Sequence, residues 1–173
     1  ELDLKISNID LLIAKIHFTL GNYITTASFL ESRIDKPDCP NRTEFLFLRA
    51  EIFLASGDIT ETENNLMSLE KTLDKHKRSD SDSLIKVQVM FFLIAMSRST
   101  PKMMAKYRDS CLSLIRARPT VKNLYTLLGA TMQGMCKLET DQEESARFLQ
   151  KATDCIDKLD QDPLSLKAFI FEM

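Results

Sequence analysis

Histidine and cysteine are the residues of this 173-residue chain best suited to chemistry, and their placement argues against catalysis. A nucleophilic site needs a base such as histidine beside a serine or a cysteine. The chain has two histidines: His17 shares a helical pattern with neighbouring isoleucines, and His76 lies in the polar segment "DKHKRSDSD". Neither has a partner residue at a fixed spacing. We therefore expect no catalytic residues and no enzymatic activity.

Metal and cofactor ligands are equally sparse. The acidic run "DSDS" at Asp80 lacks the glycine and the distal glutamate of a calcium loop, and no glycine-rich phosphate loop is present. No two cysteines lie within four residues of each other, as zinc ligands or a redox pair would. We expect no metal, no cofactor and no small-molecule substrate. The cysteines are instead typical of reduced, mostly buried residues in a cytoplasmic or nuclear protein: Cys39, Cys111, Cys136 and Cys155.

The composition is that of a globular domain and favours helices. Hydrophobic residues make up 44% of the chain and charged residues 28%, whereas it has only 4 glycines and 5 prolines. The net charge of −2 is dispersed, which argues against nucleic acid as the main partner. No apolar run reaches the roughly 18 residues of a membrane-spanning helix, so we expect no membrane insertion.

Apolar residues recur every three or four positions along the chain, and no segment alternates with a period of two. The prolines fall in junctions or in a first turn. These patterns predict an all-α fold of eight or nine helices whose short connections make neighbours antiparallel. Ser99 and Thr100 are expected to cap the sixth helix. The expected helices cover Leu4–Leu20, Tyr23–Ile34, Phe45–Ala55, Ile59–Leu73, Leu84–Arg98, a segment from Pro101, Val121–Leu138, a segment after Thr140 or Asp141, and a segment from Leu164.

Two stretches of the chain repeat one pattern at a distance of 36 residues. "AKIHFTLGNYITTA" begins at Ala14 and "AEIFLASGDITETE" begins at Ala50, with Gly21 and Gly57 at equivalent positions. Glycine tolerates the positive φ at the end of a helix, and a small residue lets two helices approach closely. A repeat of this length, built from two antiparallel helices, is typical of an α-solenoid.

These stretches resemble tetratricopeptide repeats, which combine such a small residue with a glycine and a polar residue in the turn. The resemblance departs at Thr26 and Thr62, where that family favours a smaller residue, and in the longer later units. HEAT-type repeats remain an alternative for the second half. The resemblance implies a right-handed α-α superhelix of antiparallel helix pairs. It covers residues 1–173 as a single domain within a longer array, with units at 3–38, 41–78, 83–119 and 120–161 and another starting at 163.

The resemblance also implies a function. Tetratricopeptide proteins bind an extended or helical partner segment in a concave groove, so we expect a non-catalytic scaffold in a multiprotein complex, whose partners are proteins. The known clamp for a chaperone tail is not matched, because Leu11, Lys15 and Leu48 occupy its positions. The alternative is a repeat region of a larger multi-domain enzyme that positions a substrate or an inhibitor. The groove residues implied by the resemblance are Leu11, Lys15, Phe18, Phe47, Glu51 and Leu54.

Two further features allow a functional or a purely structural interpretation. The run "KHKRSDSDS" combines basic residues with serines among aspartates, which fits a regulatory phosphorylation loop at Ser79, Ser81 and Ser83 or a simple exposed connection. The methionines of the middle and late helices fit either an adaptable binding surface or an ordinary core.

Overall fold

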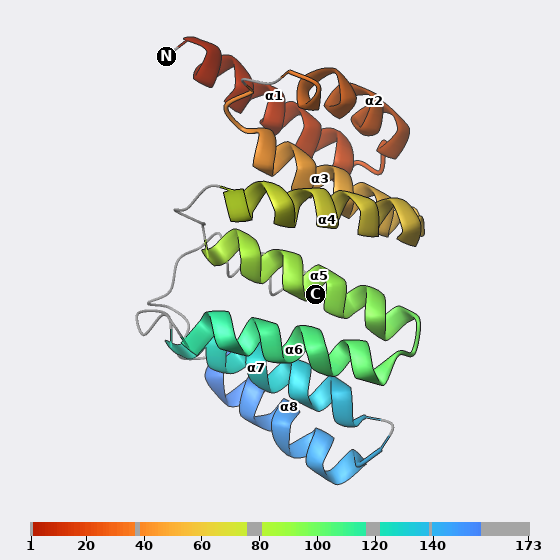
Figure 1. The fold of residues 1–173 in the computed structure, drawn as a ribbon, viewed down its shortest axis with the longest axis vertical. Helices are drawn as coiled ribbons and strands as arrows, with labels where there is room; N and C mark the ends of the chain where they lie inside the picture. Colours follow the sequence, from red (N-terminus) through yellow and green to blue (C-terminus); the bar gives the residue numbers. More distant parts are fainter. Residues whose placement is uncertain (1, 37–38, 76–80, 117–121, 139, 157–173) are drawn as a thin grey trace. The chain divides into compact units, whose positions relative to one another are not determined.

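In the computed structural model every secondary-structure element among the described residues is an α-helix (Figure 1). The structure describes residues 2–36, 39–75, 81–116, 122–138 and 140–156, and within these ranges it contains no strand. The helix starting at Leu164 lies outside the described residues, as does His76. The helices are α1 (Leu2–Thr19), α2 (Tyr23–Ile34), α3 (Arg42–Ala55), α4 (Ile59–Lys75), α5 (Ser81–Ser97), α6 (Pro101–Arg116), α7 (Lys122–Lys137) and α8 (Gln142–Ile156).

The chain divides into two compact units of four helices each among the described residues. Unit 1 spans Glu1–Lys77 and contains α1 to α4, and unit 2 spans Arg78–Met173 and contains α5 to α8. Within each unit every helix packs against its neighbour in the chain, and in unit 1 α1 also contacts α3. The predicted all-α fold with packed neighbouring helices is therefore confirmed. The superhelical arrangement stays a prediction.

The first three helix pairs share one turn. Gly21 and Gly57 have φ values of +76° and +79°, and Ser99 has a φ of +49°. After each of them, a backbone N–H reaches back five residues: Asn22 to the carbonyl of His17 (2.9 Å), Asp58 to Phe53 (2.8 Å) and Thr100 to Ala95 (2.9 Å). This 6→1 hydrogen bond with a left-handed residue is the Schellman ending of a helix. It reverses the chain within two residues and so makes the paired helices antiparallel.

The third turn corrects the expected role of Ser99 and of the Thr100 side chain, although the Thr100 carbonyl accepts the N–H of Met104 at 3.0 Å and so precedes α6 as expected. Ser99 occupies the left-handed position that ends α5, where the first two turns have glycine. The Thr100 hydroxyl donates to the carbonyl of Ala95 at 2.9 Å, so its side chain also satisfies the end of α5 rather than the start of α6. Pro101 takes the first position of α6, as predicted. Proline suits this position because an N–H there would have no hydrogen-bond partner within the helix, so its absence costs nothing.

Small residues are fully buried at equivalent places in the two pairs of unit 1. Ala14 and Ala50 have no exposed surface, and neither have Thr26 and Thr62. Each threonine hydroxyl donates to the backbone carbonyl four residues earlier, at Asn22 and Asp58, at 2.8 Å. A buried hydroxyl is costly unless it is hydrogen-bonded, and this local bond satisfies it. Threonine can therefore stand where the tetratricopeptide pattern has a smaller residue.

The last pair makes its close approach with different residues. Gly134 of α7 lies against α8, where the Ser145 hydroxyl donates to the Gly134 carbonyl at 2.8 Å. A Cβ added at Gly134 would lie 2.8 Å from Leu149 Cγ and 3.3 Å from the Ser145 carbonyl oxygen. Gly134 therefore allows the close packing of α7 against α8. Asp141 caps α8 by accepting the N–H of Glu144 at 2.9 Å, and Asp58 caps α4 in the same way.

Unit 2 has a continuous apolar core to which all four of its helices contribute. From Ile85 to Ala95, α5 is buried at every position except Lys86 and Leu93. The α5 residues Ile85, Val89 and Phe92 belong to this core. Its remaining members are Ala95, Met104, Cys111, Leu127, Leu128, Ala130, Met132, Ala152 and Cys155. The methionines Met104 and Met132 therefore serve as core residues.

The backbone of the repeated turn gives a direct test. In Gly57→Ala a new Cβ would meet no atom within 4 Å, so only the positive φ is penalised, and we expect a loss of about 1 kcal/mol of stability. In Ser99→Gly the same strain is relieved, and we expect a gain of up to about 1 kcal/mol. Urea unfolding measures both. Equal signs for the two substitutions would contradict a shared left-handed turn.

Candidate functional site

The predicted groove residues lie on α1 and α3, which contact each other in unit 1. Lys15 is exposed, whereas Leu11, Phe18, Glu51 and Leu54 are half-buried. Phe47 is buried, with 8% of its surface exposed, so it offers little area to a partner. The structure brings the two helices together, and a groove lined by these six side chains stays a prediction.

One member of the set is held in place by the repeated turn. The ring of Phe18 packs against Tyr23 of α2 with 5.6 Å between ring centroids and an interplanar angle of 43°. The backbone carbonyl of Phe18 accepts the N–H of Gly21 at 2.9 Å.

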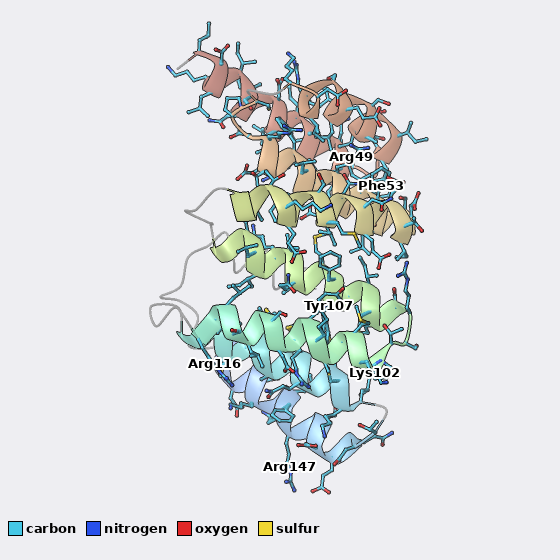
Figure 2. The ribbon with its side chains drawn as sticks, viewed as in Figure 1. Arg49, Phe53, Lys102, Tyr107, Arg116 and Arg147 are labelled. Carbon is cyan, nitrogen blue, oxygen red and sulfur yellow. The ribbon has the colours of Figure 1, made fainter. Side chains whose placement is uncertain are left out.

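On α3, the Arg49 guanidinium lies 5.5 Å from the centroid of the Phe53 ring, and both side chains are seen in Figure 2. These cation–π and aromatic contacts orient side chains beside the expected groove.

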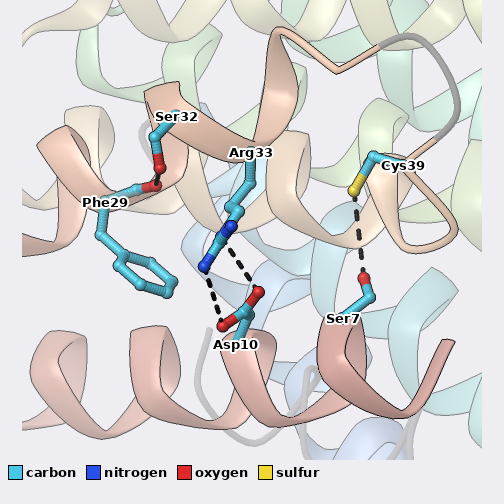
Figure 3. Close-up of polar contacts among 6 residues, drawn as sticks. All are labelled: Ser7, Asp10, Phe29, Ser32, Arg33 and Cys39. Carbon is cyan, nitrogen blue, oxygen red and sulfur yellow. Dashed lines mark hydrogen bonds and ion pairs between the residues drawn. The ribbon is translucent and has the colours of Figure 1, made fainter. Parts of the chain in front are cut away.

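A cavity of about 350 Å³ with both polar and apolar lining residues lies beside the first half of α1, and sequence reasoning did not find it. Two of the residues that line it, Asp10 of α1 and Arg33 of α2, form an ion pair (Figure 3). Arg33 Nη2 donates to Asp10 Oδ1 at 3.2 Å, and Nε lies 2.9 Å from Oδ2 without pointing its N–H at that oxygen. Its lining residues are Asp3, Ile6, Ser7, Asp10, Arg33, Lys36, Cys39, Pro40 and Phe45.

The same region ties the segment before α3 to α1. The Ser7 hydroxyl lies 3.9 Å from the Cys39 sulfur, and Asn41 Nδ2 donates to Asn8 Oδ1 at 2.7 Å (Figure 3 shows the first of these). Asp10 is turned toward Arg33, so it is not available to activate the Ser7 hydroxyl or the Cys39 thiol. The described lining contains no histidine. The cluster therefore fastens α1 to α2 and to the residues that lead into α3.

A second, smaller cavity of about 120 Å³ lies in unit 2. Three methionines, Met96, Met104 and Met135, line it together with Cys136. Small-molecule sites have about 300 Å³ or more, so this space suits at most one apolar side chain. The rest of its lining is Ser99, Pro101, Leu138 and Thr140.

Burial lowers the reactivity of two thiols of unit 2, Cys111 and Cys136. Burial raises the pKa of Cys111 from 9.0 to about 12. Burial also raises the pKa of Cys136, although the nearby Arg108 acts in the opposite direction. Because the thiolate is the nucleophile, both residues are poor nucleophiles near neutral pH. Among the described residues, moreover, no three His, Cys, Asp or Glu side chains gather as metal ligands would.

The proposed regulatory serines divide between different environments. Ser79 lies outside the described residues, whereas Ser81 and Ser83 fall within the first turn of α5. Ser83 is buried, with 7% of its surface exposed. The helix begins earlier than the sequence pattern suggested, because no strong helix-breaking residue separates Ser81 from the apolar run at Leu84. A kinase therefore cannot reach Ser83 while this turn is folded.

Comparison with known proteins gave no match to this chain among protein-family models, characterised proteins or solved structures. The tetratricopeptide resemblance thus depends on the repeated residues and the repeated turn. Within the described ranges, no helix combines the length and the apolar character needed to cross a bilayer.

The ion pair gives a prediction for unit 1. Asp10→Ala leaves the guanidinium of Arg33, whose side chain is 29% exposed, without its carboxylate, and we expect a loss of about 1–3 kcal/mol of stability. The matched control is Glu143→Ala, which removes the exposed pair with Arg147 and costs less than about 0.5 kcal/mol. Chemical unfolding measures both. A similar small effect for the two would show that the Asp10–Arg33 pair is not stabilising.

The raised thiol pKa gives a second prediction. Cys111 should react with a thiol reagent at pH 8 only after unfolding, because the folded protein holds almost all of it protonated and buried. The pKa of Cys111 is higher in the folded protein than the 9.0 of an unburied thiol, so above pH 9 the folded state retains a proton that the unfolded state loses. The contribution of Cys111 to stability is therefore present below pH 9 and is lost as the pH rises toward 12. Cys111→Ala should flatten this decline, measured by urea unfolding from pH 8 to 10.5.

Proposed function

We propose that the chain is a non-catalytic protein-interaction scaffold, a helical-repeat segment of a subunit in a multiprotein complex. It binds an extended or helical segment of a protein partner along α1 and α3. The observation that carries the proposal is the pairing of these two helices, which contact each other and keep apolar groove residues partly exposed: Leu11, Phe18 and Leu54. Half-buried apolar side chains with a fixed backbone are suited to anchoring a partner at low entropic cost.

The charges at this surface fit a partner with both polar and apolar contacts. Lys15 on α1 is exposed, and Glu51 on α3 is half-buried. A segment with an apolar anchor and an acidic residue could place the anchor against Leu11 or Leu54 and the acid near Lys15. Such a binding mode is that of a helix or extended peptide in a groove. The protonated thiols of Cys111 and Cys136 are in keeping with a non-catalytic role.

The test compares partners captured by the intact protein and by two variants. Lys15→Glu combined with Leu54→Ala changes the proposed groove without touching the buried Phe47. Lys71→Glu is the control, because it makes the same charge change at an exposed position of α4 in the same unit. We expect at least one partner to be reduced about tenfold or more by the groove variant and to be unaffected by the control.

Circular dichroism must first show that both variants are as helical as the native protein. Cross-linking of the recovered partner to α1 or α3 would then identify the binding face. An unchanged set of partners in the groove variant would contradict the proposed binding surface.

A further inference from the structure

The outward side of α1 carries a row of branched aliphatic residues that the described residues of unit 1 leave exposed. We call the following residues the aliphatic stripe: Leu2, Ile6, Ile9, Ile13 and Ile16 of α1, and Leu20, which directly follows the last residue of this helix. Their exposed fractions run from 39% for Ile13 to 71% for Leu2. The residues of α1 that are buried are instead Ser7, Asp10 and Ala14. The apolar pattern that predicted this helix therefore does not face the interior of the unit.

Comparison with α3 shows that the stripe is wider than the repeat requires. The residues of α3 that lie 36 positions after Ile9 and Ile16 are Phe45 and Ile52, and both are buried. The residues 36 positions after Ile6 and Ile13 are Arg42 and Arg49. The packing of α3 in unit 1 therefore accepts a charged residue at these two repeat positions. For this reason the same kind of packing does not explain why α1 has isoleucine, at Ile6 and Ile13, in both of them.

The stripe has the spacing of a helix–helix seam. Its members are separated by four, three, four, three and four residues, which is the heptad spacing that brings one side of a helix against another helix. The order of spacings and of residue types is the same in both directions: leucine, four isoleucines, leucine. If a second α1 runs antiparallel, Ile9 therefore faces Ile13, Ile6 faces Ile16 and Leu2 faces Leu20.

The flanks of the stripe also match in this arrangement. On one flank, Leu12 is 59% exposed and meets Leu12 of the second copy at the centre. On the other flank, Asp3 meets His17 of the second copy at both ends. Asp10 lies on that flank as well, but it is buried against Arg33 and so does not oppose its own copy. A surface that is complementary to itself is the requirement of a two-fold interface.

The exposed area is sufficient for association. The stripe and Leu12 together expose the equivalent of about four complete aliphatic residues, on the order of 600 Å² per copy. A standard-size interface uses about 800 Å² per partner, and the flanking polar side chains supply much of the difference. We propose that the aliphatic stripe of α1 is a two-fold interface through which two copies of this protein associate by antiparallel packing of their α1 helices. This surface is distinct from the groove residues Leu11, Lys15 and Phe18, so the two proposals can fail independently.

Sedimentation velocity of the intact protein, from about 1 to 100 µM, tests the proposal. We expect a reversible dimer. Ile9→Asp and Ile13→Asp should each weaken it by about 100-fold or more, because a carboxylate would be buried opposite an isoleucine. Ile24→Asp is the matched control: Ile24 is 86% exposed on α2, outside the stripe, and its replacement should leave the dimer intact.

A charge exchange separates pairing in this register from general stickiness. Chains carrying Ile9→Lys with Ile13→Lys, and chains carrying Ile9→Asp with Ile13→Asp, should each be monomeric alone and should form a heterodimer when mixed. The substituted positions are exposed in the single copy, and circular dichroism checks that the variants fold. The proposal is overturned if the intact protein is monomeric over the whole concentration range. It is overturned in the same way if hydrogen exchange shows that another segment of a monomeric chain covers α1. It is also overturned if Ile9→Asp dimerises normally or if the mixed variants stay monomeric.

Discussion

The architecture depends on one local constraint, a residue with positive φ at the end of the first helix of a pair. At Gly21, Gly57 and Ser99 this conformation lets the next N–H bond back five residues, which ends the helix and reverses the chain at once. The paired helices must then run antiparallel and close together. The fully buried alanines Ala14 and Ala50 are consistent with this close pairing.

The buried side of α1 is small and polar (Ser7, Asp10 and Ala14), whereas α2 contributes the larger buried residues Leu30 and Ile34 beside Thr26. Ala14 and Thr26 are fully buried, and the threonine hydroxyl is satisfied within its own helix. Toward the start of α1, Asp10 and Arg33 form an ion pair in the same interior (Figure 3). An ion pair within a partly buried interface adds directional contacts, which bulky aliphatic residues do not provide. The isoleucines of α1 consequently lie on the outward side.

This division leaves two separate sides of α1 for the two proposed associations. One side carries Leu11, Lys15 and Phe18 next to α3, with both apolar and charged groups. The other side carries the aliphatic stripe, which is almost purely apolar and self-complementary. A mixed surface favours selective recognition of a partner segment, and an apolar seam favours a more permanent contact. A scaffold that uses both surfaces could join two copies while each copy holds its own partner.

The helices themselves were determined by the sequence, because the features that start and stop them are local. Proline at position 101, glycine at 21 and 57 and aspartate at 58 and 141 act within a few residues, and the observed helix ends agree with them. The repeat of 36 residues likewise indicated which helices pair. The positive φ of Ser99 was not predicted, because serine rarely adopts this conformation and the neighbouring residues do not indicate it.

Which side of a helix becomes the interior was decided only by the tertiary structure. In α1 a polar row (Ser7, Asp10) and an aliphatic row (Ile9, Ile13) have the same periodicity, so either could have faced α2. The polar row faces α2 because Asp10 pairs with Arg33, which lies 23 residues away in the chain. Cys39 and Ser7 likewise meet across 32 residues. Periodicity reports only that a helix has distinct sides, whereas the partner that covers a side comes from distant parts of the chain.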